Sequence, residues 1–305
     1  MNILIAGASG FVGQELIRAL TPNHHITALG RKKASLQRDD SCHVKNCTWE
    51  ELSNLNANEY DVIINLCGYN IADSRWTEQV KKQLIDSRVN TSETLTQWAI
   101  SHNAKPRFFC ANAVGIYGLQ DNGDLESFDE DTPIDFEKPR DYLSEIGTRW
   151  QKALQTAEEY GMPVTTLRFG VVLKKNGGML KKLNLSFYLC LGSIVGDGRQ
   201  TISWVHMDDI VSAIIFLLNK PELTGAFNIT SPNPVSQAQF AQVMATSMHR
   251  PLLLTMPAFL IRALFGEMGD SLLLKGQRVL PKRLLEAGYE FHYPQLAEAL
   301  QHEFA

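Results

Sequence analysis

The sequence predicts an α/β fold in which a doubly wound parallel sheet carries a smaller, mainly helical C-terminal lobe. Over the first two-thirds of the chain, short apolar segments of strand length alternate with longer segments whose apolar residues recur at helical spacing. This alternation is typical of βαβ units and of a parallel sheet. After Arg168 the pattern changes, because glycines interrupt it at Gly177, Gly178, Gly192, Gly196 and Gly198. A segment with so many glycines does not form one regular element, so a second lobe is expected to begin there.

The individual elements follow from the apolar patterns and from the breakers between them. Five segments have the length and composition of strands: Asn2–Ala6, 25–29, 61–66, 107–111 and 164–168. Three segments have helical periodicity: Phe11–Leu20, Glu78–Ser101 and 142–160. The acidic stretch 121–140 contains two prolines and is expected to be a loop. Residues 206–218 predict a strand end followed by a helix, residues 226–230 predict a further strand, and the chain after Ser236 is mainly helical.

Length and composition indicate one large domain and a small lobe. The chain has 305 residues, of which 44% are hydrophobic and 20% charged. We expect residues 1–170 to form the main domain, with residues 204–230 returning to it, and residues 171–203 and 231–305 to form the smaller lobe. The formal net charge of −4 provides no electrostatic footprint for nucleic acid or an anionic membrane.

The N-terminus and the cysteines indicate a cytoplasmic protein without a metal site. The first strand leads directly into glycines, without a basic region or a long apolar leader. The longest apolar stretch, near residues 210–218, is far shorter than the ~20 residues that cross a bilayer. The five cysteines form no CxxC pair and the eight histidines form no HExxH pattern. We therefore expect no membrane helix, no disulfide framework and no bound metal.

The strongest motif is a glycine-rich turn, residues 7–13 with the sequence GASGFVG, between the first strand and a helix. Gly7 permits a tight turn, Gly10 lets the backbone approach a pyrophosphate, and Gly13 lets the helix pack closely on the sheet. The N-terminus of that helix also favours an anion. The turn therefore predicts a Rossmann-type dinucleotide site. The residues expected to contact the cofactor there are Gly7, Ser9, Gly10, Phe11, Val12 and Gly13.

The residues after the second strand predict the type of cofactor. Arg31, Lys32 and Lys33 stand where an NAD-binding protein usually has an acidic residue for the ribose hydroxyls. Arg31 is suited to a bidentate contact with a 2′-phosphate, and Lys32 adds a point charge. A solvated basic turn is the alternative interpretation. The pattern favours NADP(H) over NAD(H).

Further cofactor contacts are expected at later strand ends. Residues 65–68, with the sequence NLCG, end the strand 61–66 with a small residue, where the backbone would pass close to the adenosine half of the cofactor. The additional predicted contacts are Leu66, Gly68, Cys110, Ala111, Tyr142 and Gly170.

The GxxGxxG spacing resembles that of the short-chain dehydrogenase/reductase superfamily. Further motifs resemble one branch of its extended members, the epimerase-family proteins with a C-terminal domain of unknown function. The matching stretches are NLCG at 65–68, AVGIYG at 113–118, RFGVVL at 168–173, GDGRQ at 196–200, SWVH at 203–206 with Asp208 and Asp209, and GQRVLP at 276–281. They extend over almost the whole chain. The resemblance implies the fold and the nicotinamide cofactor.

The resemblance also implies a Ser or Thr, a Tyr, and a Lys four residues later, and of these the sequence retains the Tyr. The Ser or Thr position falls at Asn112 or Ala113, and Asn112 can still donate a hydrogen bond to an oxygen. Tyr142 begins a helix at the expected place, but the residue four positions later is Ile146. Arg149 is an alternative source of positive charge. We predict Tyr142 and Asn112 as catalytic residues, with packing against the nicotinamide ribose as the alternative role of Tyr142.

Substrate contacts are expected in the glycine-rich part of the lobe. Arg199 suits an anionic group, and the indole of Trp204 suits a sugar face. Glu145 is expected to be a solvated helix carboxylate, and His206, beside two aspartates, is expected to be structural.

Together these patterns favour an NADP(H)-dependent oxidoreductase that acts on a polar small molecule such as a nucleotide sugar, by hydride transfer in epimerisation or reduction. Because the Ser and the Lys are missing, a non-catalytic NADP(H)-binding sensor or regulatory protein is the alternative.

Overall fold

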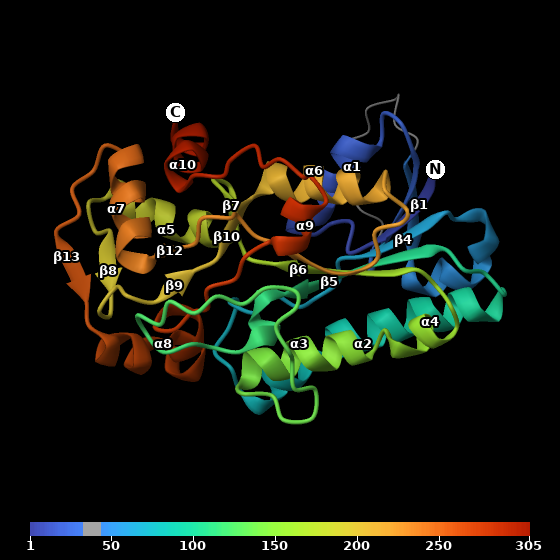
Figure 1. The fold of residues 1–305 in the computed structure, drawn as a ribbon, viewed down its shortest axis with the longest axis horizontal. Helices are drawn as coiled ribbons and strands as arrows, with labels where there is room; N and C mark the ends of the chain where they lie inside the picture. Colours follow the sequence, from blue (N-terminus) through green and yellow to red (C-terminus); the bar gives the residue numbers. More distant parts are fainter. Residues whose placement is uncertain (33–43) are drawn as a thin grey trace.

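A parallel sheet lies between two layers of helices in the computed structural model, which describes residues 1–32 and 44–305 (Figure 1). Within these residues, seven strands form the sheet in the spatial order β11-β6-β5-β4-β1-β2-β3. Their bounds are β1 Asn2–Ala6, β2 His25–Gly30, β3 Val44–Thr48, β4 Val62–Asn65, β5 Arg107–Ala113, β6 Val164–Phe169 and β11 Gly225–Ile229. The predicted doubly wound parallel sheet is confirmed.

The sheet is apolar on both faces, as expected for parallel strands covered by helices. Ile3 and Ile5 of β1 point into the core on one face, and Leu4 and Ala6 into the core on the other. All four side chains are fully buried. An uninterrupted apolar strand at the N-terminus therefore lies inside the sheet, between β4 and β2.

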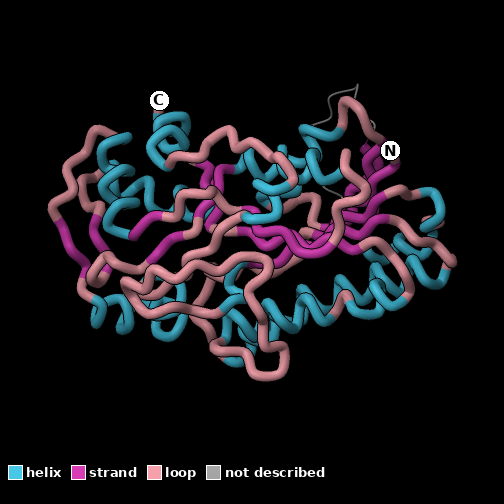
Figure 2. The backbone as a smooth tube through the Cα atoms, viewed as in Figure 1, coloured by secondary structure: helices cyan, strands magenta, loops and turns pink. Residues whose placement is uncertain are grey.

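Helices cover both faces of the sheet (Figure 2). Two lie on one face, α1 Phe11–Leu20 and α6 Met207–Leu218, and three lie on the other, α2 Glu78–Ser101, α3 Tyr142–Lys152 and α4 Gln155–Glu159. The helix predicted over residues 142–160 is thus two helices, which meet where Ala153 and Leu154 turn into the core. None of the helices within residues 1–32 and 44–305 combines the length and the apolar composition that a membrane crossing requires.

Two strands of the main sheet differ from the sequence prediction by more than a residue at either end. β5 continues two residues beyond the predicted end, to Ala113, which moves the exposed end of this strand. β3 was not expected, because its sequence VKNCT has no apolar run. As an edge strand beside β2 it buries only Cys47, so hydrophobicity gives little signal.

The lobe has its own small core and short strand pairs. The pairs are β7 Val171–Lys174 with β10 Trp204–His206, β8 Ser193–Val195 with β13 Leu254–Met256, and β9 Thr201–Ile202 with β12 Val235–Ser236. The helices are α5 Gly178–Tyr188, α7 Gln237–Ser247, α8 Ala258–Leu273 and α10 Leu296–Phe304. Part of the C-terminal segment packs on the main domain instead, since Leu284 of α9 Lys282–Glu286 lies in the core around β1 and α6. β10 pairs with β7 outside the main sheet, and β11 is the strand that returns to it.

Candidate cofactor and active site

The predicted cofactor residues gather where the strand order reverses. β1 has β2 on one side and β4 on the other. The chain adds strands first on the β2 side and then on the β4 side, so the sheet has its switch point between β1 and β4. The turn 7–13 follows β1 and the segment 66–68 follows β4, so both lie at the carboxyl edge of the sheet. Ligands of open α/β sheets bind in the crevice at this edge.

The three glycines of the turn differ in what the fold requires of them. Gly7 has φ +81°, and a Cβ there would lie 2.8 Å from the carbonyl carbon of Leu66. A Cβ on Gly13 would lie 2.4 Å from the Gly7 carbonyl oxygen. Gly10 has φ −74°, and a Cβ there would meet one described atom within 4 Å, the Gly7 carbonyl oxygen at 3.0 Å. Gly7 and Gly13 are therefore required by packing, whereas Gly10 keeps an exposed surface free.

Helix α1 begins at this free surface. Gly10 is its N-cap and provides no side chain, so the N–H groups of Phe11, Val12 and Gly13 have no capping acceptor. Such a helix start attracts phosphate groups through its N–H groups and its dipole. The ring of Phe11 lies against Gly177 of the lobe, where a Cβ would come within 2.0 Å of the ring. The lobe thus reaches the cofactor turn.

Arg31 and Lys32 follow β2 with exposed side chains, and Lys33 lies outside the described residues. Arg31 makes no ion pair with another described residue. Its charge acts on Cys67, the residue after Leu66, although burial is the larger effect and raises the pKa of that thiol to about 12. The basic end of β2 therefore adjoins the segment after β4.

That segment is held by side chains from β4 and α2. The Asn65 Oδ1 atom accepts a hydrogen bond from the Cys67 N–H at 3.1 Å, and the Ser87 Oγ atom accepts one from the Tyr69 N–H at 2.9 Å. Gly68 between them is exposed. The predicted contacts Leu66 and Gly68 therefore belong to an ordered loop beside the glycine turn.

Two predicted cofactor contacts on β5 have little or no exposed surface, and their contact with a cofactor stays a prediction. Cys110 has no exposed surface, and its sulfur lies 3.5 Å from the Ser92 hydroxyl inside the core. Ala111 is buried in the same core. Because β5 is longer than expected, its exposed end is Ala113. Gly170 is explained by packing, since a Cβ there would lie 2.6 Å from the Ser203 carbonyl oxygen, and its contact with a cofactor stays a prediction.

Tyr142 is the first residue of α3, after the N-cap Asp141. Its hydroxyl donates a hydrogen bond to the Lys81 carbonyl oxygen of α2 at 2.8 Å, and its ring meets the Trp76 ring edge-on at 5.0 Å. Burial, with nearby carboxylates adding to it, raises the pKa of Tyr142 to about 12. The phenol is therefore engaged and harder to ionise than a free tyrosine.

The position of the missing lysine faces apolar side chains. Ile146 is 5% exposed and packs in a cluster with Trp76, Leu84 and Met268. A lysine there would place its ammonium among them. Arg149 does not replace it, because its guanidinium pairs with Glu145 at 2.7 Å, so that prediction is wrong.

Asn112 has a structural role instead of the predicted catalytic one. Its side-chain amide donates to the Gly147 carbonyl oxygen at 3.0 Å, and its Oδ1 accepts from the Ala113 N–H at 2.8 Å. The residue is 2% exposed. It fastens α3 to the end of β5 and is not available to a substrate oxygen.

Of the two predicted substrate residues, Arg199 is exposed and Trp204 is not. The Arg199 guanidinium lies over Gly123 in the acidic loop, where a Cβ would come within 2.2 Å of it. Trp204 is fully buried in the core of the lobe, and its indole N–H donates to the Asn233 carbonyl oxygen at 2.9 Å. The prediction that this indole meets a sugar face is therefore wrong.

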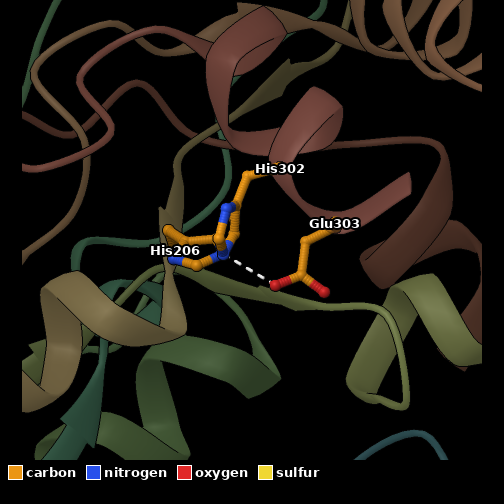
Figure 3. Close-up of side chains that lie close together, drawn as sticks. All are labelled: His206, His302 and Glu303. Carbon is orange, nitrogen blue, oxygen red and sulfur yellow. Dashed lines mark hydrogen bonds and ion pairs between the residues drawn. The ribbon is translucent and has the colours of Figure 1, made fainter. Parts of the chain in front are cut away.

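The structural role expected for His206 is confirmed, and it lies in the junction between β10 and α10 (Figure 3). Its Nδ1 accepts from the Asp208 N–H at 3.2 Å, which caps α6, so Nε2 carries the proton and donates to Glu303 at 2.9 Å. Burial lowers the pKa of His206 despite the neighbouring carboxylates. Burial alone would raise the pKa of Glu303, but hydrogen bonds from the Lys175 N–H and His206 hold it below its usual value.

His206, His302 and Glu303 also present ligand atoms within 4.8 Å of one another, the spacing of a metal site. Glu303 is already engaged there, since the Lys174 ammonium lies 3.6 Å from its Oε1 and His206 donates to the same oxygen. His206, Glu303 and Lys174 form a polar cluster, called the latch below, that joins the C-terminal helix α10 to β10 and β7.

Two surface hollows are lined by residues of α2, and by residues of α3 and the loop before it. One is lined by Gln79, Lys82, Gln83, Asp86, Ser87, Asn90 and Thr91, and the other by Phe136, Glu137, Pro139, Asp141, Glu145, Thr148, Arg149 and Lys152. Neither contains a residue of the glycine turn. The chemistry of the turn, and not the depth of the surface, identifies the candidate site.

The latch predicts a loss of stability in mild acid. His206 must stay neutral in the folded protein, so stability should fall as pH drops below about 6.5, the pKa of an unperturbed histidine. His206→Asn keeps an N-cap acceptor for Asp208 but does not titrate. We expect it to be about 1–3 kcal/mol less stable at pH 7 and to show a flatter dependence of Tm on pH between 6.5 and 5.

Thermal unfolding across this pH range checks the prediction, with His249→Asn as the control. His249 is exposed and has φ +54°, which asparagine tolerates. The control should keep the wild-type slope. Identical slopes for wild type and His206→Asn would contradict the role given to the buried imidazole.

Comparison with known proteins places the chain in a family. Residues 3–230 match the model of the NAD dependent epimerase/dehydratase family, and residues 256–303 match a domain of unknown function, DUF1731. An epimerase family protein of Mycobacterium bovis is 34% identical over 298 residues, covering 98% of this chain and 96% of that protein. One of Bacillus subtilis is 35% identical over 303 residues, with 98% and 97% covered.

Solved structures agree in fold. The structure of the human epimerase family protein SDR39U1 (isoform 2) with NADPH matches with a TM-score of 0.86 and 29% identity, covering 99% of this chain and 98% of that one. A UDP-glucuronic acid 4-epimerase from Bacillus cereus in complex with NAD matches with a TM-score of 0.74 and 16% identity over 100% and 96% of the two chains. The chain belongs to the NAD dependent epimerase/dehydratase family.

Proposed function

We propose that the protein binds NADP(H) at the carboxyl edge of the sheet and acts as an epimerase-like oxidoreductase on a polar small molecule such as a nucleotide sugar. The main support for the proposal is the free surface that Gly10 leaves at the start of α1. A side chain there would require the Gly7 carbonyl oxygen to shift by a few tenths of an ångström, and the glycine leaves a free surface at the start of α1. A pyrophosphate accounts for that space.

The charge at the end of β2 supports the choice of cofactor. Arg31 and Lys32 are exposed beside the segment after β4, and a 2′-phosphate is a ligand that a guanidinium recognises in a bidentate manner. NADPH is also the ligand in the similar human structure.

The substrate class rests on the family and on the lobe. The bound nicotinamide would supply the hydride donor or acceptor. Arg199, exposed in the loop 196–200, offers a positive charge for an anionic group of the substrate. Tyr142 would serve as acid or base after its hydroxyl leaves the Lys81 carbonyl. The engaged phenol and the buried Asn112 favour, as a second candidate, a non-catalytic NADP(H)-binding sensor.

The cofactor assignment predicts a preference that Arg31 determines. Wild type should bind NADPH more tightly than NADH. Arg31→Ala should weaken NADPH binding by about 10- to 100-fold, the effect of losing a charge-assisted hydrogen bond, and leave NADH binding unchanged. Calorimetric titration with both cofactors measures this, and Arg18→Ala, an exposed arginine on α1, controls for general charge. Equal affinities for the two cofactors, or an unchanged preference in Arg31→Ala, would remove the basis of the assignment.

The environment of Tyr142 predicts a slow reaction at neutral pH. With a pKa of about 12, the phenolate is about one part in 100,000 at pH 7. Any hydride transfer that uses Tyr142 as a base should therefore accelerate about tenfold per pH unit from pH 7 to 9, without a plateau. Tyr142→Phe should abolish this rise.

Stopped-flow absorbance of NADPH with a series of nucleotide sugars provides the rates. A plateau below pH 8, or a Tyr142→Phe variant as fast as wild type, would show that another group is the base. Tight NADPH binding without turnover of any sugar tested would favour the sensor.

A further inference from the structure

Arg88 is an unpaired cation on the buried side of α2. It shares that side with Leu84, Ser92 and Leu95. Its Nη1 donates to the Leu84 carbonyl oxygen at 2.7 Å, and its guanidinium lies 4.9 Å from the centre of the Trp150 ring in α3. Within the described residues no carboxylate pairs with Arg88, and its buried Nε has no hydrogen-bond partner. Burial lowers the pKa of Arg88 to about 10.

Apart from its contact with the Trp150 ring, the Arg88 guanidinium contributes little to folding. A desolvated charge without a counter-ion is unfavourable, and its hydrogen bond goes to a carbonyl that already belongs to the helix ladder. An apolar side chain of similar length would fill the space against Trp150 without that penalty. A ligand whose oxygen atoms accept hydrogen bonds from the guanidinium would account for an arginine at position 88.

The position of Arg88 points to the cofactor site. The guanidinium lies against Gly68, where a Cβ would come within 3.1 Å of Cζ and 3.2 Å of Nη2. Gly68 is exposed in the loop after β4, and the preceding Leu66 touches Gly7 of the glycine turn. A side chain at position 68 would press on the guanidinium, which would have to shift by a few tenths of an ångström.

Two cations act on Tyr142, whose motif lacks its lysine: the Lys81 ammonium lies 4.9 Å from the centre of the Tyr142 ring, and Arg88 acts through its charge. The charge of Arg88 opposes the rise in the pKa of Tyr142, although burial and the carboxylates outweigh it. Ile146 and Arg149 do not provide this charge, because the first is apolar and the second pairs with Glu145.

We propose that Arg88 is a cofactor-binding residue, and that its guanidinium binds oxygen atoms of the part that NADH and NADPH share. The inference rests on the proposed NADP(H) site. It differs from the role of Arg31, which concerns the 2′-phosphate alone.

The test compares two partly buried arginines, each replaced by methionine. Arg88→Met should weaken NADH and NADPH binding by the same factor, about 10- to 100-fold, and leave the Tm of the cofactor-free protein unchanged or higher. Arg107 is the matched control. It also has a buried Nε without a partner, but it donates to the Leu217 and Leu218 carbonyl oxygens at the end of α6, at 2.8 and 2.7 Å. Arg107→Met should lower Tm and leave both affinities unchanged.

Calorimetric titration of the full chain gives the affinities for both cofactors, and thermal unfolding gives Tm. Each outcome supports or overturns the inference. Arg88→Met that binds both cofactors like wild type overturns the inference while the proposed function stands. A loss confined to NADPH overturns it too, because the 2′-phosphate would then be the contact. A lower Tm of Arg88→Met with unchanged affinities shows a structural role. A wild-type protein that binds neither cofactor overturns the proposed function and the inference with it.

Discussion

Backbone contact at the switch point is the constraint on which the rest of the site depends. The helix α1 can follow β1 so closely because Gly13 lies against the Gly7 carbonyl oxygen, and Gly7 lies against Leu66 at the end of β4. Side chains at either glycine would separate strand, turn and neighbouring loop. With those contacts in place, the N–H groups of α1, the basic end of β2 and the loop around Gly68 share one edge of the sheet.

Residues that α2 and α3 contribute or contact hold the other side of that edge. Asn112 fastens α3 to β5, Ser87 holds the loop after β4, and Arg88 brings a charge from α2 to Gly68. The lobe meets the glycine turn through Phe11 against Gly177, whereas the His206–Glu303 latch joins α10 to β10 within the lobe. The cofactor half of the site is thus built into the fold, whereas the residues expected for catalysis are occupied by structural hydrogen bonds.

The sequence was sufficient for the fold and for the glycine turn, because both depend on local patterns. An apolar strand, a glycine spacing and a helix period need no knowledge of distant contacts. The site beyond the turn depends on side-chain direction. Cys110, Asn112 and Trp204 lie near strand ends in the chain, yet the pleat and the packing of α3 and the lobe turn them into the core.

Arg88 shows the opposite error, since the sequence did carry a signal for it. On the helix Glu78–Ser101, residues 84, 88, 92, 95 and 99 recur at helical spacing, and the other four are buried. A charged residue in that register is unusual enough to indicate a function. Its partner could not be inferred, because Gly68 and Trp150 come to it from other elements.

Binding of NADPH to Gly10→Val tests the central claim most directly. The backbone at Gly10 is extended, with φ −74° and ψ 171°, so valine is compatible with its conformation, and the Gly7 oxygen needs to move by only a few tenths of an ångström. Calorimetry should show no NADPH binding by a variant whose circular dichroism and cooperative unfolding match those of wild type. A folded Gly10→Val variant that binds NADPH with wild-type affinity would contradict the account.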